Sequence, residues 1–387
     1  MSGNQKAEIA TVIDNFLPLL HQQKPLPNVH LRTLHALQQC RTEEMGGRVE
    51  NCTQCGHEQI IYNSCRNRHC PKCGSIDRER WLAEREADLL PVNYLHIVFT
   101  IPDKLNHLFL HHQVDCYNML FRVVNQVMTG FAANPKFLDA RIGYTAILHT
   151  WGQNLQYHPH LHLLVPAGGI TRNNKWKPSK GKGSFLFPVD QMSSVFRAQM
   201  VEALRKYIRV EQLKVGPGLL NTLFTKEWVV YAKSPFASPK QVLSYLGRYT
   251  HRVAISNNRI LQVNNKQVTF SWRDYHQDYK QIVTTMDGTD FFFFFSLHIL
   301  PHGFTRIRHY GFLSSAAKTK ALAVMGEYFC LPSKTKYIKI SWQAIAREKM
   351  GIKAQCCKKC GHLMQLTRII PDHFHRPIRA PTYAALN

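Results

Sequence analysis

The chain contains the stretch Tyr157-His158-Pro159-His160-Leu161-His162-Leu163-Leu164-Val165, in which histidines and apolar residues alternate after Pro159. Successive side chains on a β-strand point to opposite faces of a sheet, so His160 and His162 are expected on the same face. The leucines between and after them would then point into a core. Two neighbouring imidazoles can bind a divalent cation, or they can make hydrogen bonds only. The stretch predicts a strand with one packed face and one candidate metal face.

The segments around this strand predict a mixed α+β fold. Residues 94–101 and 142–150 are rich in aromatic and β-branched residues, which favour strands. A polar turn at residues 152–154 would join the second of these to the histidine strand as a hairpin. Residues 105–128 and 192–212 show the spacing of amphipathic helices. The sequence therefore predicts a sheet with helices packed beside it.

The charge of the chain indicates a polyanionic partner. Its 387 residues include 49 Lys and Arg against 25 Asp and Glu, a formal net charge of +24. Nucleic acid is the first expectation and an anionic membrane surface the second. The longest apolar run, residues 291–300, is too short and too interrupted to span a membrane, although its five phenylalanines fit a buried element. The N-terminus lacks the layout of a secretory signal, so we expect a cytoplasmic protein.

Eleven cysteines in such a chain indicate metal binding rather than disulfides. Two CxxC pairs, Cys52 with Cys55 and Cys70 with Cys73, are expected to bind one structural Zn²⁺. Further candidate zinc ligands are Cys65 and His69. Arg66 and Arg68 lie in the same segment and are candidate phosphate contacts, so the zinc segment could serve folding, DNA contact or both.

A third CxxC pair, Cys357 with Cys360, lies near the C-terminus, with His373 and His375 downstream. The histidine spacing departs from that of a usual zinc finger. Two interpretations stay open, a second zinc site or exposed thiols in a loosely ordered tail.

Two tyrosines in residues 240–252, a predicted helix, are candidate nucleophiles. Tyr245 and Tyr249 are four residues apart, which places both phenols on one helix face, and Arg248 and Arg252 repeat this spacing beside them. A tyrosine hydroxyl can attack a phosphodiester when a cation neutralises the charge that develops on the phosphate. Two tyrosines at this spacing often serve only in packing. The interpretation as nucleophiles therefore rests on their combination with the histidine pair and with the positive net charge of the chain.

The chain resembles the rolling-circle insertion-sequence transposases of the IS ninety-one type, in the two-tyrosine class of the HUH endonuclease superfamily, where U is an apolar residue. The resemblance runs from Cys40 to about Phe312 and rests on five ordered blocks. These are residues 62–73, residues 148–153, residues 158–165, residues 245–256 and residues 303–311. Arg306 and Arg308, in the last block, are further candidate DNA contacts.

The resemblance implies an antiparallel-sheet nuclease core with flanking helices, a small N-terminal zinc-binding domain and a helical C-terminal part. It implies that His160 and His162 bind Mg²⁺ or Mn²⁺ and that Tyr245 and Tyr249 cleave single-stranded DNA, with no nucleotide cofactor. The usual third polar ligand is assigned to Gln241, one helical turn before Tyr245, in preference to His158.

We expect N-terminal helices in residues 1–45, the zinc-binding domain in 46–85, the nuclease in 91–290 and a C-terminal region with a possible second zinc site in 291–387. The implied function is a transposase that cuts and rejoins strands at the ends of a mobile element. Two alternatives remain at this stage. A rolling-circle replication initiator would share the chemistry, and a non-catalytic zinc protein would bind nucleic acid through charge alone.

Overall fold

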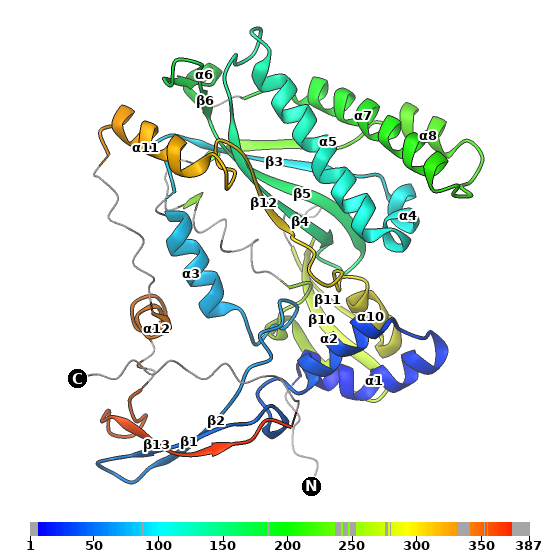
Figure 1. Ribbon diagram of the computed structural model, residues 1–387. Coiled ribbons are helices and arrows are strands. Elements are labelled where there is room, and N and C mark those ends of the chain that lie inside the picture. Colours follow the sequence, from blue (N-terminus) through cyan, green and yellow to red (C-terminus); the bar gives the residue numbers. More distant parts are fainter. Residues whose placement is uncertain are drawn as a thin grey trace.

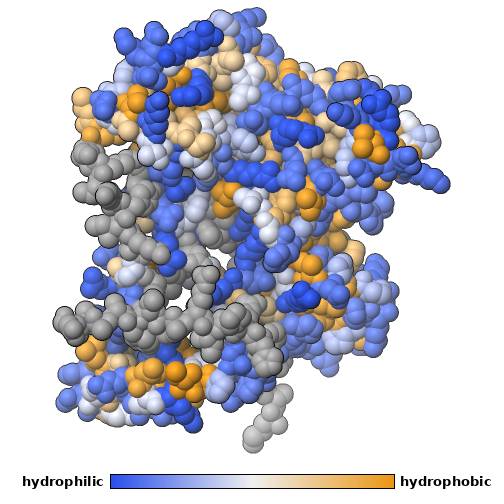
Figure 2. Space-filling view, in the orientation of Figure 1, coloured by the Kyte–Doolittle hydropathy of each residue, from blue (hydrophilic) through white to orange (hydrophobic). Residues whose placement is uncertain are grey.

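The computed structural model describes most of the chain, and Figure 1 shows its arrangement. The described residues are 7–86, 88–183, 186–236, 241, 242, 247, 253–274, 278, 280–331, 341–351, 353 and 355–373. Within them, no helix is long and apolar enough to cross a membrane. The face shown in Figure 2 is largely hydrophilic, as expected for a chain with 49 lysines and arginines.

A five-stranded sheet forms the centre of the fold, and every neighbouring pair of its strands is antiparallel. Its strands, in spatial order, are β12 (Ile307–Gly311), β4 (Gly143–Trp151), β5 (Tyr157–Pro166), β3 (Tyr94–Thr100) and β8 (Val230–Phe236). Strands β4 and β5 form the predicted hairpin. The predicted α+β class with an antiparallel sheet is confirmed.

Two long helices, α5 (Gln113–Ala133) and α7 (Val189–Val210), cover one face of this sheet, and α3 (Ser75–Glu86) lies on its other side (Figure 1). Leu161 and Leu163 are fully buried in the core beneath α5 and α7. The alternation of the strand therefore places its histidines on the face that carries α3. Short helices α4 (Asn106–His111) and α8 (Leu219–Thr225) extend the helical layer.

A second core lies between the two N-terminal helices and a three-stranded sheet. It joins α1 (Ile9–Gln23) and α2 (Asn28–Gln38) to β9 (Ile260–Val263), β10 (Gln267–Asp274), β11 (Lys280–Asp287) and α10 (Gly288–Ser296). Phe291, Phe292 and Phe295 are buried here, so the phenylalanine run is a buried element as predicted. A Cβ at Gly288 would lie 1.9 Å from the Phe16 ring, so only glycine allows α10 to approach α1 this closely.

The two ends of the chain meet in a small sheet. Strands β1 (Gly47–Cys52) and β2 (Glu58–Tyr62) form a hairpin, and β13 (Met364–Ile370) pairs antiparallel with β1. Figure 1 shows this sheet apart from the central one. The C-terminal region contains the helices α11 (Lys318–Tyr328) and α12 (Trp342–Met350), yet its strands β12 and β13 complete sheets begun far earlier in the chain. Its helices agree with the expected helical C-terminal part, and its two strands are an addition that the sequence did not predict.

The remaining described elements are short. They are α6 (Lys180–Gly183), β6 (Gly168–Ile170), β7 (Trp176–Pro178), η1 (Glu43–Met45), η2 (Asp103–Leu105) and η3 (Asn257–Arg259).

Candidate metal centre

Three histidines converge on the face of the central sheet that carries α3. His160 and His162 come from β5, and His149 comes from β4, where its Cα pairs directly with that of His160. Their ligand nitrogens lie within 4.8 Å of one another. His149, His160 and His162 are only 3%, 9% and 8% exposed, respectively. Backbone pairing between adjacent strands thus holds a compact set of three nitrogen donors.

Hydrogen bonds behind the cluster orient two of the rings. His160 Nδ1 donates to the carbonyl oxygen of His158 at 2.6 Å, which leaves the lone pair of His160 Nε2 directed at His162 Nε2, 3.0 Å away. His162 Nδ1 in turn lies 2.8 Å from His96 Nε2 on β3. Metal-bound histidines characteristically use their second ring nitrogen in this way.

Burial keeps the His160 and His96 rings neutral, and metal ligation by His160 requires the neutral form. Desolvation lowers the pKa of His160 to about 4, with the nearby His158 adding to the effect. Burial also lowers the pKa of His96 to about 3, and Lys233 and His160 contribute to that shift. A neutral imidazole offers a lone pair to a cation, whereas an imidazolium offers none. His160 can therefore offer its lone pair to a divalent metal near neutral pH.

His149 lies beside His160 and His162 and offers a third nitrogen donor, a residue that the sequence had not suggested; Gln241 had been the predicted third ligand. Gln241 is exposed, and His158, the other choice, lies outside the cluster with its Nδ1 3.7 Å from the Asp103 carboxylate. The alternation pattern of the sequence carried no signal for His149. A regular continuation of the Trp151–Tyr157 pairing would place residue 149 opposite residue 159, on the other face of the sheet, and a β-bulge between His149 and Trp151 shifts it to His160.

The tyrosine pair, Tyr245 with Tyr249, lies outside the described residues, as do Arg248 and Arg252. Two described residues of the same stretch of sequence are Val242 and Gly247. Val242 is fully buried against Ile147 and Leu164, on the same sheet face as the histidines. Gly247 lies beside α3, where an added Cβ would be 3.0 Å from Leu82 Cδ1. Val242 and Gly247 therefore both lie on the histidine side of the sheet.

The structure does not bring Cys52 and Cys55 to Cys70 and Cys73, which corrects the predicted grouping. A first cluster instead consists of Cys40, Cys65, Cys70 and Cys73, and Cys40 was not among the predicted zinc ligands. Its Cys40 and Cys73 sulfurs are 3.4 Å apart, and its Cys65 and Cys73 sulfurs are 3.6 Å apart. The other two predicted ligands belong to a second cluster with Cys357 and Cys360. Four thiolates are the usual donor set of structural zinc.

Two predicted histidine ligands lie outside these clusters. His69 is buried, and its Nε2 accepts a hydrogen bond from the Leu300 backbone N–H at 3.3 Å. Burial lowers the pKa of His69, and the neighbouring Arg68 and Arg306 lower it further. His373 is also absent from both clusters, and its backbone N–H donates to the Glu44 carbonyl. His375 is outside the described residues.

Three of the arginines assigned to DNA are used inside the protein. Arg68 donates to the carbonyl oxygens of Phe304 and Pro301. Arg306 is 8% exposed, and burial lowers its pKa to about 10, so its side chain is packed inside the protein. Arg308 donates to Asn118 Oδ1 at 2.6 Å and stacks over an aromatic ring of the core. These internal contacts were not predicted, because charge alone does not reveal an internal partner.

Arg66 differs from these three arginines. It is exposed and has a positive φ of 51°, in the loop that supplies Cys65 to the first cluster. It remains a predicted phosphate contact.

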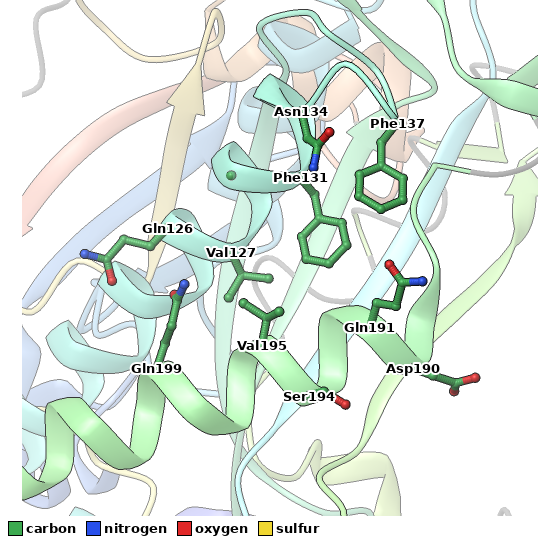
Figure 3. Close-up of a pocket in the computed structure, with 11 residues that line it drawn as sticks. Gln126, Val127, Phe131, Asn134, Phe137, Asp190, Gln191, Ser194, Val195 and Gln199 are labelled. Atoms are coloured by element: carbon green, nitrogen blue, oxygen red, sulfur yellow. The ribbon is translucent and has the colours of Figure 1, made fainter.

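A cavity of about 550 Å³ lies on the other side of the sheet, between α5 and α7 (Figure 3). Its walls include Phe131, Phe137 and Val195, with Gln126, Gln191 and Asp190 at its edge. Since α5 and α7 cover the opposite sheet face from the histidines, this cavity is separate from the histidine cluster.

Known proteins match this chain over nearly its whole length. A family described as "Transposase zinc-binding domain" matches residues 12–101, and one described as "Putative transposase" matches residues 143–321. "Putative transposase y4qJ" of Sinorhizobium fredii is 40% identical over 375 residues, which cover 92% of this chain and 94% of that protein. "Transposase for insertion sequence element IS801" of Pseudomonas savastanoi pv. phaseolicola is 26% identical over 370 residues, 91% of this chain and 86% of that protein. No solved structure matches the chain significantly.

The first cysteine cluster falls wholly inside the matched zinc-binding domain, and its four sulfurs suit a structural Zn²⁺. The matched transposase region begins at the start of β4 and includes all three clustered histidines. The chain therefore belongs to the insertion-sequence transposases of the IS ninety-one type.

Proposed function

We propose that this transposase cleaves and rejoins single-stranded DNA at the ends of a mobile element by rolling-circle transposition. In this proposal His149, His160 and His162 bind the divalent metal, and Tyr245 and Tyr249 are the nucleophiles. The observation that carries it is the buried histidine trio on the sheet face against which Val242 packs. On a helix, residues three and seven positions after Val242 share its face, which is where both tyrosines fall in the sequence.

The cleavage reaction needs a nucleophile, a cation that neutralises negative charge on the phosphate, and an intermediate that conserves the energy of the cleaved bond. A tyrosine oxygen attacks the scissile phosphorus and loses its proton, while the bond to the 3′ oxygen breaks and that oxygen leaves as a 3′ hydroxyl. The 5′ phosphate stays on the tyrosine as an ester. A divalent cation supplies charge neutralisation at the phosphate when bound.

Rejoining reverses these bond changes on a different strand. A 3′ hydroxyl attacks the phosphotyrosine, the new phosphodiester forms, and the tyrosine oxygen leaves and regains a proton. Each ester conserves the energy of the cleaved bond, so no nucleotide cofactor is required. A second tyrosine lets donor and target strands be held as esters at the same time.

The donor set favours Mn²⁺ over Mg²⁺ in this proposal. All three clustered donors are imidazole nitrogens, whereas Mg²⁺ strongly prefers oxygen ligands and keeps several waters. His160 and His162 hold fixed orientations through their outer ring nitrogens, so the metal would meet a preformed site.

The test is covalent capture of DNA. Labelled single-stranded oligonucleotides that carry the element's ends are incubated with the protein and Mn²⁺ or Mg²⁺, then run on a denaturing gel. We expect a protein–DNA adduct that persists in Tyr245→Phe and in Tyr249→Phe singly, and disappears when both are changed. Tyr328→Phe is the matched control, because Tyr328 is an exposed tyrosine of α11. Absence of an adduct with either metal, or its survival in the double variant, overturns the proposal.

A further inference from the structure

Two segments 305 residues apart carry the same six-residue pattern, Cys-x-x-Cys-Gly-His. The first is Cys52-Thr53-Gln54-Cys55-Gly56-His57, and the second is Cys357-Lys358-Lys359-Cys360-Gly361-His362. The first lies in the turn between β1 and β2, and the second immediately precedes β13. Only the first lies within the range matched by the zinc-binding domain.

The two segments also fold alike. Cys52 N–H donates to the His57 carbonyl at 2.9 Å, and Cys357 N–H donates to the His362 carbonyl at 2.7 Å. Gly56 and Gly361 each donate to the carbonyl of the first cysteine of their own segment, at 3.1 and 2.9 Å. Their φ angles, 66° and 78°, are left-handed, which explains glycine at this position in both.

The same backbone turn directs an N–H at the first sulfur of each segment. Gln54 N–H donates to Cys52 Sγ at 3.5 Å, and Lys359 N–H donates to Cys357 Sγ at 3.3 Å. A hydrogen bond to sulfur favours the thiolate, which is the form that binds metal. Each segment is therefore a preformed two-thiolate half-site.

Strand pairing brings the two half-sites face to face. Strand β13 runs antiparallel to β1, with Cys52 opposite Met364 at one end and Gly47 opposite Ile370 at the other. The Cys52–Cys360, Cys55–Cys357 and Cys55–Cys360 sulfur pairs are then 3.3, 3.6 and 3.4 Å apart. A disulfide would need about 2.0 Å. Four sulfurs at about 2.3 Å from one tetrahedral Zn²⁺ lie about 3.8 Å from each other, close to the observed separations.

We propose that Cys52, Cys55, Cys357 and Cys360 bind a second Zn²⁺, which fastens the C-terminal segment to the N-terminal zinc-binding domain. The N-terminal domain holds only two of the four ligands, so this site exists only when both ends of the chain are present. The two half-sites and the β13-β1-β2 sheet form one zinc ribbon made from the two ends of the chain.

The experiment compares the metal content of full-length variants, measured by mass spectrometry after dialysis into Mg²⁺ buffer. We expect Cys357→Ser with Cys360→Ser to contain one zinc fewer per chain than the unaltered protein. Cys356→Ser is the matched control and keeps the full zinc content, because Cys356 is adjacent but outside the cluster. Any zinc at the histidine cluster is common to all variants and cancels in the comparison.

A conservative variant protects the test against misfolding. Cys360→His retains a ligand, so it should keep its zinc, and in the Co²⁺-substituted protein it should shift the d–d absorption bands as one sulfur donor becomes nitrogen. Cys356→His should leave the bands unchanged. An unchanged zinc content in the double serine variant, or unchanged bands in Cys360→His, overturns the second site. These readouts do not involve DNA cleavage, so they are independent of the proposed nuclease function.

Discussion

The first cysteine cluster and the histidine cluster are built from opposite kinds of backbone. Cys65, Cys70 and Cys73 lie in residues 63–74, which contain no helix or strand, and Cys40 follows the end of α2. The histidines instead lie on adjacent strands in the middle of the central sheet. A loop without regular hydrogen bonding needs its metal to hold it in place, whereas the sheet presents its histidines whether or not a metal is bound.

The surroundings of the two clusters extend this difference. Cys40, Cys65 and Cys70 are part of the core that contains Phe16 and Phe270, so their cluster is continuous with the packing of the N-terminal helices. The histidines lie opposite a separate core beneath α5 and α7. Loss of metal should therefore loosen the fold at the first cluster and remove only chemistry at the second.

The largest effect is expected at the first cysteine cluster. Cys40→Ser combined with Cys73→Ser should remove one zinc and loosen the N-terminal core, because structural zinc contributes on the order of 10 kcal/mol of binding free energy. Hydrogen exchange should become fast in α1 and β10 while β4 and β5 stay protected. Cys330→Ser, at an exposed cysteine outside the clusters, is the control. Slow exchange in α1 and β10 of a variant that has lost zinc would show that the metal does not hold this core.

At the histidine cluster we expect a loss of activity with little loss of stability. His160→Ala should lower the yield of the protein–DNA adduct about 1,000-fold, which corresponds to about 4 kcal/mol. The melting temperature should stay within a few degrees of that of the unaltered protein, because the sheet is held from its other face. His107→Ala, in the exposed part of α4, is the matched control. If His160→Ala strongly lowered both the adduct yield and the melting temperature, the histidine cluster would also be structural, and the proposed difference between the two clusters would be wrong.

The alternation of residue types over short stretches was enough to predict the central strands. The alternation after Pro159 predicted that His160 and His162 share a face, and the described hairpin has them there. His149 could not be found in this way, because a β-bulge between His149 and Trp151 shifts the hairpin register by one residue. The shared face of the two histidines and the hairpin itself depend on residues within about 20 positions of each other. Over such distances periodicity and turn chemistry determine the geometry.

Contacts between distant segments could not be predicted in the same way. The two CxxC pairs nearest in sequence were grouped around one zinc, yet the β1–β2 hairpin directs Cys52 and Cys55 away from Cys70 and Cys73. Their true neighbours come from the opposite end of the chain. Arg306 illustrates the same limit, because its burial depends on how β12 joins the central sheet.

A smaller effect is expected behind the histidine cluster, at His96. This residue contacts His162 Nδ1 and is a positioning residue rather than a metal ligand. Loss of such a partner typically weakens metal affinity 10- to 100-fold, or about 2 kcal/mol. His96→Ala should therefore require more Mn²⁺ for half-maximal adduct formation, with the yield recovered at saturating metal. A yield that stays low at saturating Mn²⁺ would assign His96 a role other than positioning His162.

The smallest effect is expected at His298, a buried histidine outside the metal clusters. This residue tests how burial alone changes protein stability with pH, apart from any effect of metal. Its Nε2 donates to the Leu155 carbonyl at 2.9 Å, and burial lowers its pKa to about 4. In the unfolded chain the pKa of His298 is near 6.5, so the unfolded state binds a proton at a higher pH than the folded state does. As the pH falls, stability is therefore lost between about pH 6.5 and 4. At pH 5.5 the expected loss is about 1.4 kcal/mol relative to pH 7.5.

The measurement for His298 is denaturant unfolding at both pH values, with His298→Gln as the comparison, since glutamine keeps a donor for the Leu155 carbonyl. The unaltered protein should lose about 1.4 kcal/mol more than the variant over this interval. Identical losses would mean that His298 does not resist protonation in the folded protein. A difference that appears only when Mn²⁺ is present would instead link His298 to the histidine cluster, which its separate hydrogen bonds to Leu155 and Thr150 argue against.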